Sequence, residues 1–263
     1  DITTIMKLIK ELWHYREMII SLVKRDLKGR YKGSVMGFLW TMINPLLQLA
    51  VYTFVFSVIM PSGVERFYLF LFVALVPWLF FSTCLSTGTT VIFAQQEMVK
   101  KIYFPRQILP ISFTISQFVN MLLSFVVIFI VLIFSGIKFN FKALACLPII
   151  MLVQFILCLG ITFVVSALTV YLRDLEYILS IISMAWMYLT PILYPIENVP
   201  EAYRGICYIN PMTSIIVAYR DILYSSKVPE MGTLVIAVFM GILLLAIGLV
   251  SFEHLQRHFA EEL

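Results

Sequence analysis

Six long stretches without a charged side chain constrain this chain more than any other feature. They cover residues 38–60, 67–94, 108–137, 143–172, 177–194 and 232–252. A helix needs about 20 apolar residues to cross about 30 Å of hydrocarbon, a length that the fifth stretch only just approaches. Because 61% of the residues are hydrophobic and only 13% are charged, the chain lacks the polar surface of a water-soluble fold. We expect an all-α integral membrane protein with six transmembrane helices.

The distribution of Lys and Arg predicts the orientation of these spans. The N-terminal segment is rich in both, and Lys100, Lys101, Arg106, Arg173 and Arg257 fall on the same side of the membrane. The opposite side receives fewer: Arg66, Lys138, Lys142, Arg204, Arg220 and Lys227. Short cytoplasmic loops carry the excess of positive charge. Both termini are therefore expected on the cytoplasmic side of the membrane.

The chain is expected to form a single domain, 1–263, in three parts. Residues 1–32 repeat apolar side chains at helical spacing, with charges mostly on the other side, which indicates an amphipathic helix at the membrane interface. A cytoplasmic helix packed on a partner is the alternative. Residues 38–252 form the membrane bundle, and 253–263 form a cytoplasmic tail.

A proline-rich segment separates the fifth and sixth spans. Pro191, Tyr194, Pro195, Asn210 and Pro211 belong to it. Proline interrupts helices, yet the intervening residues remain apolar and aromatic. Such non-helical backbone is tolerated at membrane depth where protein or a water-filled cavity shelters it. We expect short re-entrant helices in the outer leaflet, rather than an ordinary outer loop.

Several kinds of chemistry are missing from the sequence. The expected spans contain no Asp, Glu, Lys, Arg or His in their interiors, which argues against ion-coupled transport and against a membrane enzyme. The chain has no Gly-Lys dipeptide and hence no P-loop for nucleotide. His254 and His258 lack a third ligand, so no metal site is predicted. The chain is not expected to be an enzyme, to hold a cofactor or to bind nucleic acid.

The loop between the second and third spans mixes charges with large apolar residues, which we expect to be exposed. It includes Glu97, Met98, Val99, Lys100, Lys101, Ile102, Tyr103, Phe104 and Pro105. A solvated turn seldom carries five large apolar side chains, so a short helix docking in a partner's groove explains them better. Packing on the lipid headgroups is the alternative.

Three blocks of sequence form a recognisable set. The first block comprises residues 25–34 with 37–40 and 44–46, and the second is the loop 99–106. The third comprises 173–175, 190–195, 210–212 and 219–220. The blocks occur in order and are spread over most of the chain. Together they resemble the permeases of ABC-2 type transporters, and most closely the polysaccharide exporters for O-antigen, capsule and teichoic acid. The resemblance implies a location in the inner membrane of a bacterial cell.

This resemblance implies a homodimer around a translocation pathway, with two ABC ATPase subunits that bind ATP and Mg²⁺. It implies that the loop 97–105 couples ATP hydrolysis to the helices, and that the proline-rich segment forms part of the exit. It also implies that a lipid-linked glycan enters beside the N-terminal helix, where Lys24, Arg25, Lys28, Arg30 and Tyr31 lie.

Aromatic residues of the first and fifth spans are candidates for the pathway: Trp40, Tyr52, Phe54, Trp186 and Tyr188. Their rings can stack on sugars, although packing and interfacial belts also recruit aromatic residues. An exporter of a drug or small lipid, and a membrane enzyme acting on lipid-linked sugars, are the alternative functions.

Overall fold

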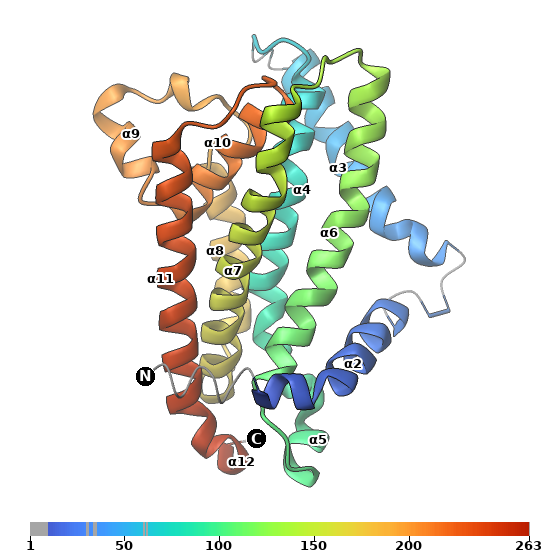
Figure 1. Ribbon diagram of the computed structural model, residues 1–263, viewed down its shortest axis with the longest axis vertical. Helices are drawn as coiled ribbons and strands as arrows, with labels where there is room; N and C mark the ends of the chain where they lie inside the picture. Colours follow the sequence, from blue (N-terminus) through green and yellow to red (C-terminus); the bar gives the residue numbers. More distant parts are fainter. Residues whose placement is uncertain (1–9, 30–31, 34–35, 60, 62, 263) are drawn as a thin grey trace.

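The computed structural model describes residues 10–29, 32–33, 36–59, 61 and 63–262, and its regular secondary structure is helical (Figure 1). Residues 10–14 are helical and lead into the first complete element. The elements are α2 (Arg16–Gly29), η1 (Gly37–Leu39), α3 (Trp40–Phe54), η2 (Val55–Ile59), α4 (Phe67–Ser86), η3 (Thr87–Thr90), η4 (Phe93–Gln95), α5 (Gln96–Lys101), α6 (Ile108–Phe134), α7 (Phe141–Tyr171), α8 (Leu175–Leu189), η5 (Ile196–Asn198), α9 (Glu201–Cys207), α10 (Pro211–Leu223), α11 (Met231–Leu255), η6 (Gln256–His258) and α12 (Phe259–Glu262). The all-α prediction is confirmed.

Within the described residues, five helical stretches are long and apolar enough to cross a membrane. They are Trp40–Ile59, Phe67–Thr90, Ile108–Phe134, Phe141–Tyr171 and Met231–His258. The remaining candidate, α8, has 15 residues. At 1.5 Å per residue it reaches about 22 Å, short of the about 30 Å of a bilayer core. The expected fifth span is thus helical only to Leu189 and continues as non-helical chain, and the count of six spans remains a prediction.

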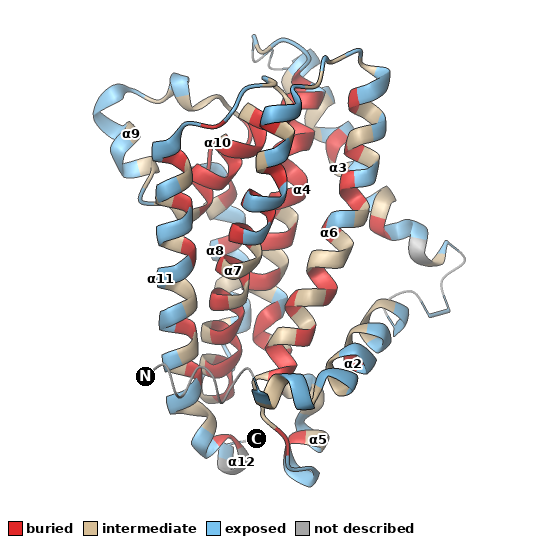
Figure 2. Cartoon of the chain, in the orientation of Figure 1, coloured by how far each residue is buried: buried red, intermediate tan, exposed pale blue. Residues whose placement is uncertain are grey.

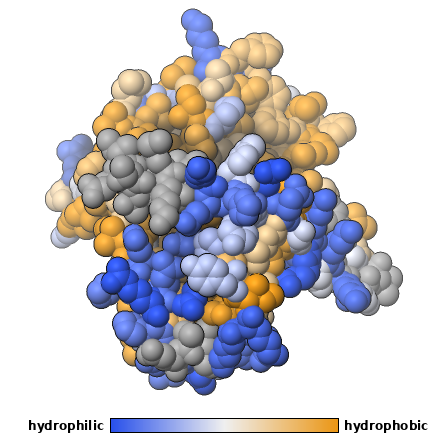
Figure 3. Space-filling model, turned by 60° about the horizontal axis from the view of Figure 1, so that its bottom comes forward, coloured by the Kyte–Doolittle hydropathy of each residue, from blue (hydrophilic) through white to orange (hydrophobic). Residues whose placement is uncertain are grey.

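The bundle has two chemically different ends. In Figure 1, α2, α5 and α12 lie at the lower end, whereas α9 and the end of α10 lie at the upper end. Figure 3 shows that hydrophilic side chains gather on the lower end and hydrophobic ones cover the flank beside it. This pattern fits a bundle flank in lipid and a lower end in water.

Helix α4 is the centre of the larger of two hydrophobic cores. Nearly every residue from Leu69 to Phe81 is buried, and α4 is the most completely buried of the membrane-length helices (Figure 2). It packs against α3, α6, α7, α8 and α10. An apolar helix that shows no polar face belongs inside a bundle.

Helices α7 and α11 form the closest pair in the bundle. A Cβ atom added to Gly248 would overlap the carbonyl oxygen of Gly160, and one added to Gly160 would lie 2.5 Å from the carbonyl carbon of Leu244. Small residues let two membrane helices approach until their backbones touch. These two helices are therefore expected to move as one body.

The second core, called the lower core below, lies at the lower end and joins six elements and the loop after α5. It contains Leu22 of α2, Val99 of α5, Phe104, Ile108 of α6, Phe163 of α7, Phe252 of α11 and Phe259 of α12. Apolar surface removed from water stabilises this assembly in proportion to its area. The lower core places the N-terminal helix, the loop 96–106 and the C-terminal end in contact with one body of side chains.

Candidate functional site

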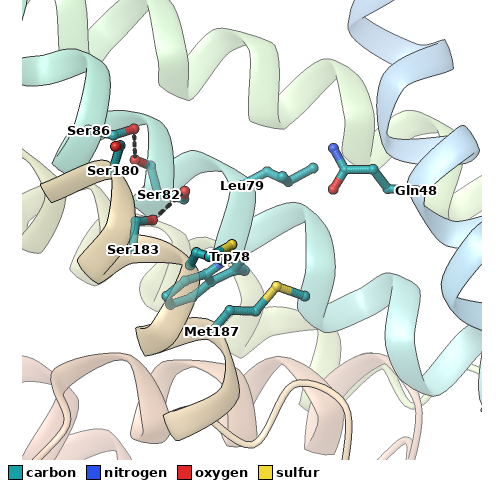
Figure 4. A pocket seen from close by; sticks show the side chains of 9 residues that line it. Gln48, Trp78, Leu79, Ser82, Ser86, Ser180, Ser183 and Met187 are labelled. Atoms are coloured by element: carbon teal, nitrogen blue, oxygen red, sulfur yellow. Dashed lines mark hydrogen bonds between the residues drawn. The ribbon is translucent and has the colours of Figure 1, made fainter. Parts of the chain in front are cut away.

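A polar pocket of about 220 Å³ opens between α3, α4 and α8 (Figure 4). The hydroxyl groups of Ser82 and Ser183 are hydrogen bonded at 2.7 Å and tie α4 to α8. The Ser86 hydroxyl donates to the carbonyl oxygen of Ser82, also at 2.7 Å. The remaining lining residues are Gln48, Trp78, Leu79, Ser180, Met184 and Met187.

The lining of this pocket consists of hydroxyl, amide, aromatic and thioether groups and includes no ionisable side chain. Figure 4 shows Gln48 on the opposite side from the four serines. Such groups exchange hydrogen bonds with a hydroxylated ligand without holding it by charge. The pocket suits weak, repeated contacts with a neutral polar molecule at membrane depth.

The five aromatic residues predicted for a pathway do not form one group. Tyr52 of α3 donates its hydroxyl to the Met187 sulfur at 3.8 Å, beside the serine-lined pocket. The Trp186 ring meets Phe81 edge to face, with centroids 5.2 Å apart. Tyr188 and Phe54 are both exposed, on α8 and α3. All four remain candidates for the pathway, although the Trp186 ring also packs against Phe81.

The fifth aromatic residue, Trp40, lines a separate pocket of about 140 Å³ between α3, α4 and α6. Its polar lining includes Asn44, Gln117 and Asn120. Pro45 also lines this pocket and lies within α3. Proline frees the carbonyl four residues earlier, and the Ser124 hydroxyl donates to that carbonyl, on Thr41, at 3.4 Å.

The loop between α4 and α6 has an inward and an outward side. The side chain of Tyr103 is 98% exposed and that of Ile102 is 56% exposed, whereas Val99 and Phe104 are buried in the lower core. Met98 and Pro105 are half-buried, and Lys100 is exposed. The sequence suggested that all five apolar residues are exposed, which is wrong for Val99 and Phe104. They anchor the loop while Ile102 and Tyr103 project from it.

The charged residues of this loop support its short helix. Lys101 and Glu97 form an exposed ion pair at 2.6 Å, one helical turn apart. Such pairs contribute about 0.3–0.5 kcal/mol to a helix. The ion pair therefore helps to shape α5, and the lower core holds it in place.

The N-terminal helix α2 turns its apolar side to the bundle. Leu22 is buried in the lower core, and the Ser116 hydroxyl of α6 donates to the Asp26 carboxylate. Lys24, Arg25 and Lys28 are exposed. This division fits the amphipathic helix predicted for 1–32 over its described part. Arg30 and Tyr31 lie outside the described residues.

The proline-rich segment closes the upper end of the bundle. After α8 ends at Leu189, the chain passes through Pro191 and Pro195 to η5 and α9. It returns to Asn210, whose side chain accepts a hydrogen bond from the Met212 N–H at 3.0 Å and thereby caps α10. The same amide donates to the Thr190 hydroxyl at 2.8 Å. Asn210 thus joins the end of α8 to the start of α10.

Helix α10 is short and almost entirely buried. It packs against α4, α7 and α11, and its Tyr219 is fully buried. The Tyr219 hydroxyl donates to the Gln154 side-chain oxygen of α7 at 2.8 Å, while the Gln154 amide donates to the Pro77 carbonyl of α4 at 2.7 Å. One amide therefore links three helices. This arrangement fits the predicted re-entrant helix, with Pro211 as its first residue.

Arg220 is the functional candidate that sequence reasoning missed. It was expected in an outer loop, but its side chain is buried, because the whole of α10 lies inside the bundle. Its guanidinium donates to the carbonyls of Pro191 and Ile192, to Tyr194 at 3.3 Å and to Phe70 at 3.3 Å. It also lies 3.5 Å from the centre of the Phe70 ring. A planar cation with five donors can hold several carbonyls at once, which a lysine cannot.

The next residue, Asp221, faces the loop at the upper end, outside the five membrane-length helices. Its partial burial, followed by the nearby carboxylates of Glu230 and Glu197, raises its pKa from the ordinary 3.8 to about 6, while Lys227 lowers it. The surroundings of this carboxyl therefore favour its neutral form.

Together, the membrane-length helices, the uncharged pocket and the protruding lower loop define a multi-pass α-helical transport protein. The chain belongs to the ABC-2 type transporter family, whose model matches residues 17–224. It is 34% identical over 260 residues to the O-antigen export system permease protein RfbA of Myxococcus xanthus, covering 98% of this chain and 100% of that one. The RfbA permease of Klebsiella pneumoniae is 33% identical over 256 residues, which cover 97% of this chain and 98% of the other.

A more distant similarity extends to the polysialic acid transport protein KpsM of Escherichia coli, 21% identical over 239 residues, 89% of this chain and 91% of KpsM. The family predicted from the three sequence blocks is confirmed. The prediction that the chain is a transport subunit rather than an enzyme is confirmed as well. An ABC-2 permease works with an ABC ATPase, so a partner of that class follows from the family.

Proposed function

We propose that this chain is the permease half of an ATP-driven exporter that moves a lipid-linked polysaccharide across the bacterial cytoplasmic membrane. Two copies would surround the pathway, and two ATPase subunits would supply the energy. The lower end would face the cytoplasm, where its excess of Lys and Arg is favoured. The chain itself would hold no nucleotide, because ATP and Mg²⁺ would bind to the partner.

The observation that carries this proposal is the uncharged polar pocket on the open face of α3 and α8. A polymer must pass repeatedly through the same contacts, so each unit should bind weakly. Ser82, Ser180, Ser183 and Gln48 offer neutral hydrogen bonds, which suit sugar hydroxyls. The full-length similarity to O-antigen export permeases supports a polysaccharide of the O-antigen, capsule or teichoic acid type.

A second copy is proposed because one copy leaves this face uncovered. Exposed apolar residues line both helices, among them Val51 and Phe54 on α3 and Ile181 and Met184 on α8. The polar pocket opens between the same helices. A twofold partner would enclose the pocket within a pathway and cover the surrounding residues.

The ATPase is proposed to bind the outward side of the loop 97–105. Tyr103 and Ile102 project there from anchored neighbours, and exposed aromatic groups are favoured anchors at protein interfaces. Nearby, Lys24, Arg25 and Lys28 on α2 would attract anionic lipid headgroups at the cytoplasmic surface. The glycan lipid would enter beside them and leave past the segment containing Pro191, Tyr194, Pro195, Asn210 and Pro211.

The test is export in a host strain that lacks the native gene, complemented by this chain and its ATPase. Surface polysaccharide is measured with the normal ATPase and with an ATPase that cannot hydrolyse ATP. We expect polysaccharide at the surface only with the active ATPase, and accumulation inside the cell otherwise. Export that continues without ATP hydrolysis would refute the proposal, and normal surface polysaccharide without this chain would point to a drug or small lipid as substrate.

A further inference from the structure

Arg106 connects the end of the lower loop to the C-terminal segment, residues 256–262. It is half-buried and donates from its guanidinium to the carbonyl oxygen of Gln256. The same group lies over the ring of Phe259, 5.8 Å from its centre. Arg106 and Gln256 are 150 positions apart in the chain, so their contact joins two otherwise separate parts of the sequence.

Phe259 fixes the other side of this contact in the lower core. It is fully buried and meets Phe252 of α11 edge to face, with centroids 5.5 Å apart. Its ring also lies 6.4 Å from that of Tyr171 at the end of α7. The Tyr171 hydroxyl donates to the Leu255 carbonyl at 2.7 Å. The C-terminal segment is therefore bound to both α7 and α11.

The pair formed by α7 and α11 is suited to transmit a displacement. Gly160 and Gly248 bring the two backbones into contact, without a side chain that could rearrange between them. Packed helices with no free volume move together rather than deform. A displacement of the C-terminal segment would move both helices, and α10 packs against both.

We propose that the C-terminal segment is a coupling element, and that Arg106 and Phe259 are the positioning residues through which the lower loop drives α7 and α11. This inference rests on the proposed function, because it assumes that an ATPase displaces the loop. Val99 and Phe104 anchor the loop by non-directional apolar contacts. The hydrogen bond of Arg106 is directional and gives the loop a fixed connection to α11.

The experiment uses the complete complex with its ATPase, both in the host strain and purified in lipid. The probe is the polysaccharide that the host assembles, and the measured quantity is surface polysaccharide relative to the rate of ATP hydrolysis per folded complex. For Arg106→Ala we expect this ratio to fall about ten-fold, as when one hydrogen bond to a charged group is lost from the coupled step. Phe259→Ala removes the ring that contacts the guanidinium and anchors the segment in the lower core, and we expect a fall of similar size. The double variant should fall no further than either single variant.

Arg257→Ala is the matched control, since Arg257 lies in the same segment and is exposed. It should keep the normal ratio. Arg106→Lys retains the cation without the planar group, and is expected to restore part of the ratio. A purely structural role would lower the amount and thermal stability of the complex, but would leave the ratio unchanged.

The outcomes separate the two proposals. If polysaccharide still appears at the surface with an ATPase unable to hydrolyse ATP, the proposed function fails. If export requires hydrolysis but the Arg106 and Phe259 variants keep the normal ratio per folded complex, only the coupling role of the C-terminal segment is refuted. If Arg106→Ala does not assemble, Arg106→Lys and Phe259→Leu give the same ratio measurement.

Discussion

The two ends of this molecule are held together by different kinds of interaction. At the lower end, an apolar core that includes Leu22, Val99, Phe104 and Phe259 gathers elements from the whole chain. At the upper end, one buried guanidinium, that of Arg220, holds a non-helical segment through its carbonyls. Apolar contacts are non-directional and allow small displacements, whereas hydrogen bonds fix one geometry. The lower end is therefore suited to receive movement, and the upper end to keep a shape.

The largest effect is expected from a charge placed in the lower core. Phe104→Asp removes a buried aromatic side chain and buries a carboxylate, so we expect a loss of about 4 kcal/mol or more of stability. Tyr103→Asp changes the neighbouring but exposed residue and should leave stability within about 0.5 kcal/mol while weakening ATPase binding. Thermal unfolding of the purified chain and co-purification of the ATPase measure the two effects. Equal losses of stability would contradict the division of this loop.

The corresponding change at the upper end is Arg220→Met. It leaves the carbonyls of Pro191 and Ile192 without their donor, and each unpaired buried group costs about 1–3 kcal/mol. We expect a loss of about 3 kcal/mol in unfolding measurements, and faster proteolysis at residues 190–195.

Arg204→Met is the control for that experiment. Arg204 also donates to carbonyls, of Val199 at 2.9 Å and Glu197 at 2.8 Å, but its side chain is 38% exposed. Water can replace these hydrogen bonds, so the cost should stay below about 1 kcal/mol. Similar losses for the two variants would show that burial does not distinguish the arginines.

A smaller change tests whether hydrogen bonds also position α10 within the bundle. Tyr219→Phe removes the hydroxyl that donates to Gln154 and keeps the ring. Gln154 keeps its own bond to the Pro77 carbonyl, so we expect a loss of about 1–1.5 kcal/mol in thermal unfolding. A neutral result would assign the position of α10 to apolar packing alone.

The smallest expected effect depends on pH. The pKa of Asp221 is raised to about 6 in the folded chain, against an ordinary value of 3.8. The folded state therefore binds the proton more tightly, and its stability falls as pH rises from about 4 through about 6. Asp221→Asn should raise the unfolding temperature slightly at about pH 8 and change it little at about pH 4. A gain that is equal at both pH values would exclude the carboxylate charge as the cause.

The sequence predicted the parts of the fold that depend on hydrophobic length. Five of the six charge-free stretches overlap the membrane-length helices, and the prolines marked where α8 ends and α10 begins. It could not show which side of a short loop faces inward, so Phe104 was assigned to the exposed surface. The sequence also placed Arg220 in an outer loop, because an arginine normally indicates exposed chain. The sequence does not show that backbone carbonyls surround this side chain. The apolar run at residues 215–219, directly before Arg220, was the available sign of burial.

The polar face of α3 also bears on how cells handle surplus copies of this chain. Gln48 donates to Asn44 at 3.3 Å, yet the pair still exposes amide atoms along a membrane-length helix. Against lipid, each unsatisfied polar group costs several kcal/mol. If the proposed second copy covers this face, a copy without a partner would carry that cost on its surface and would be more open to chaperones and proteases. The amount of permease in the cell would then follow the number of completed assemblies rather than the rate of synthesis.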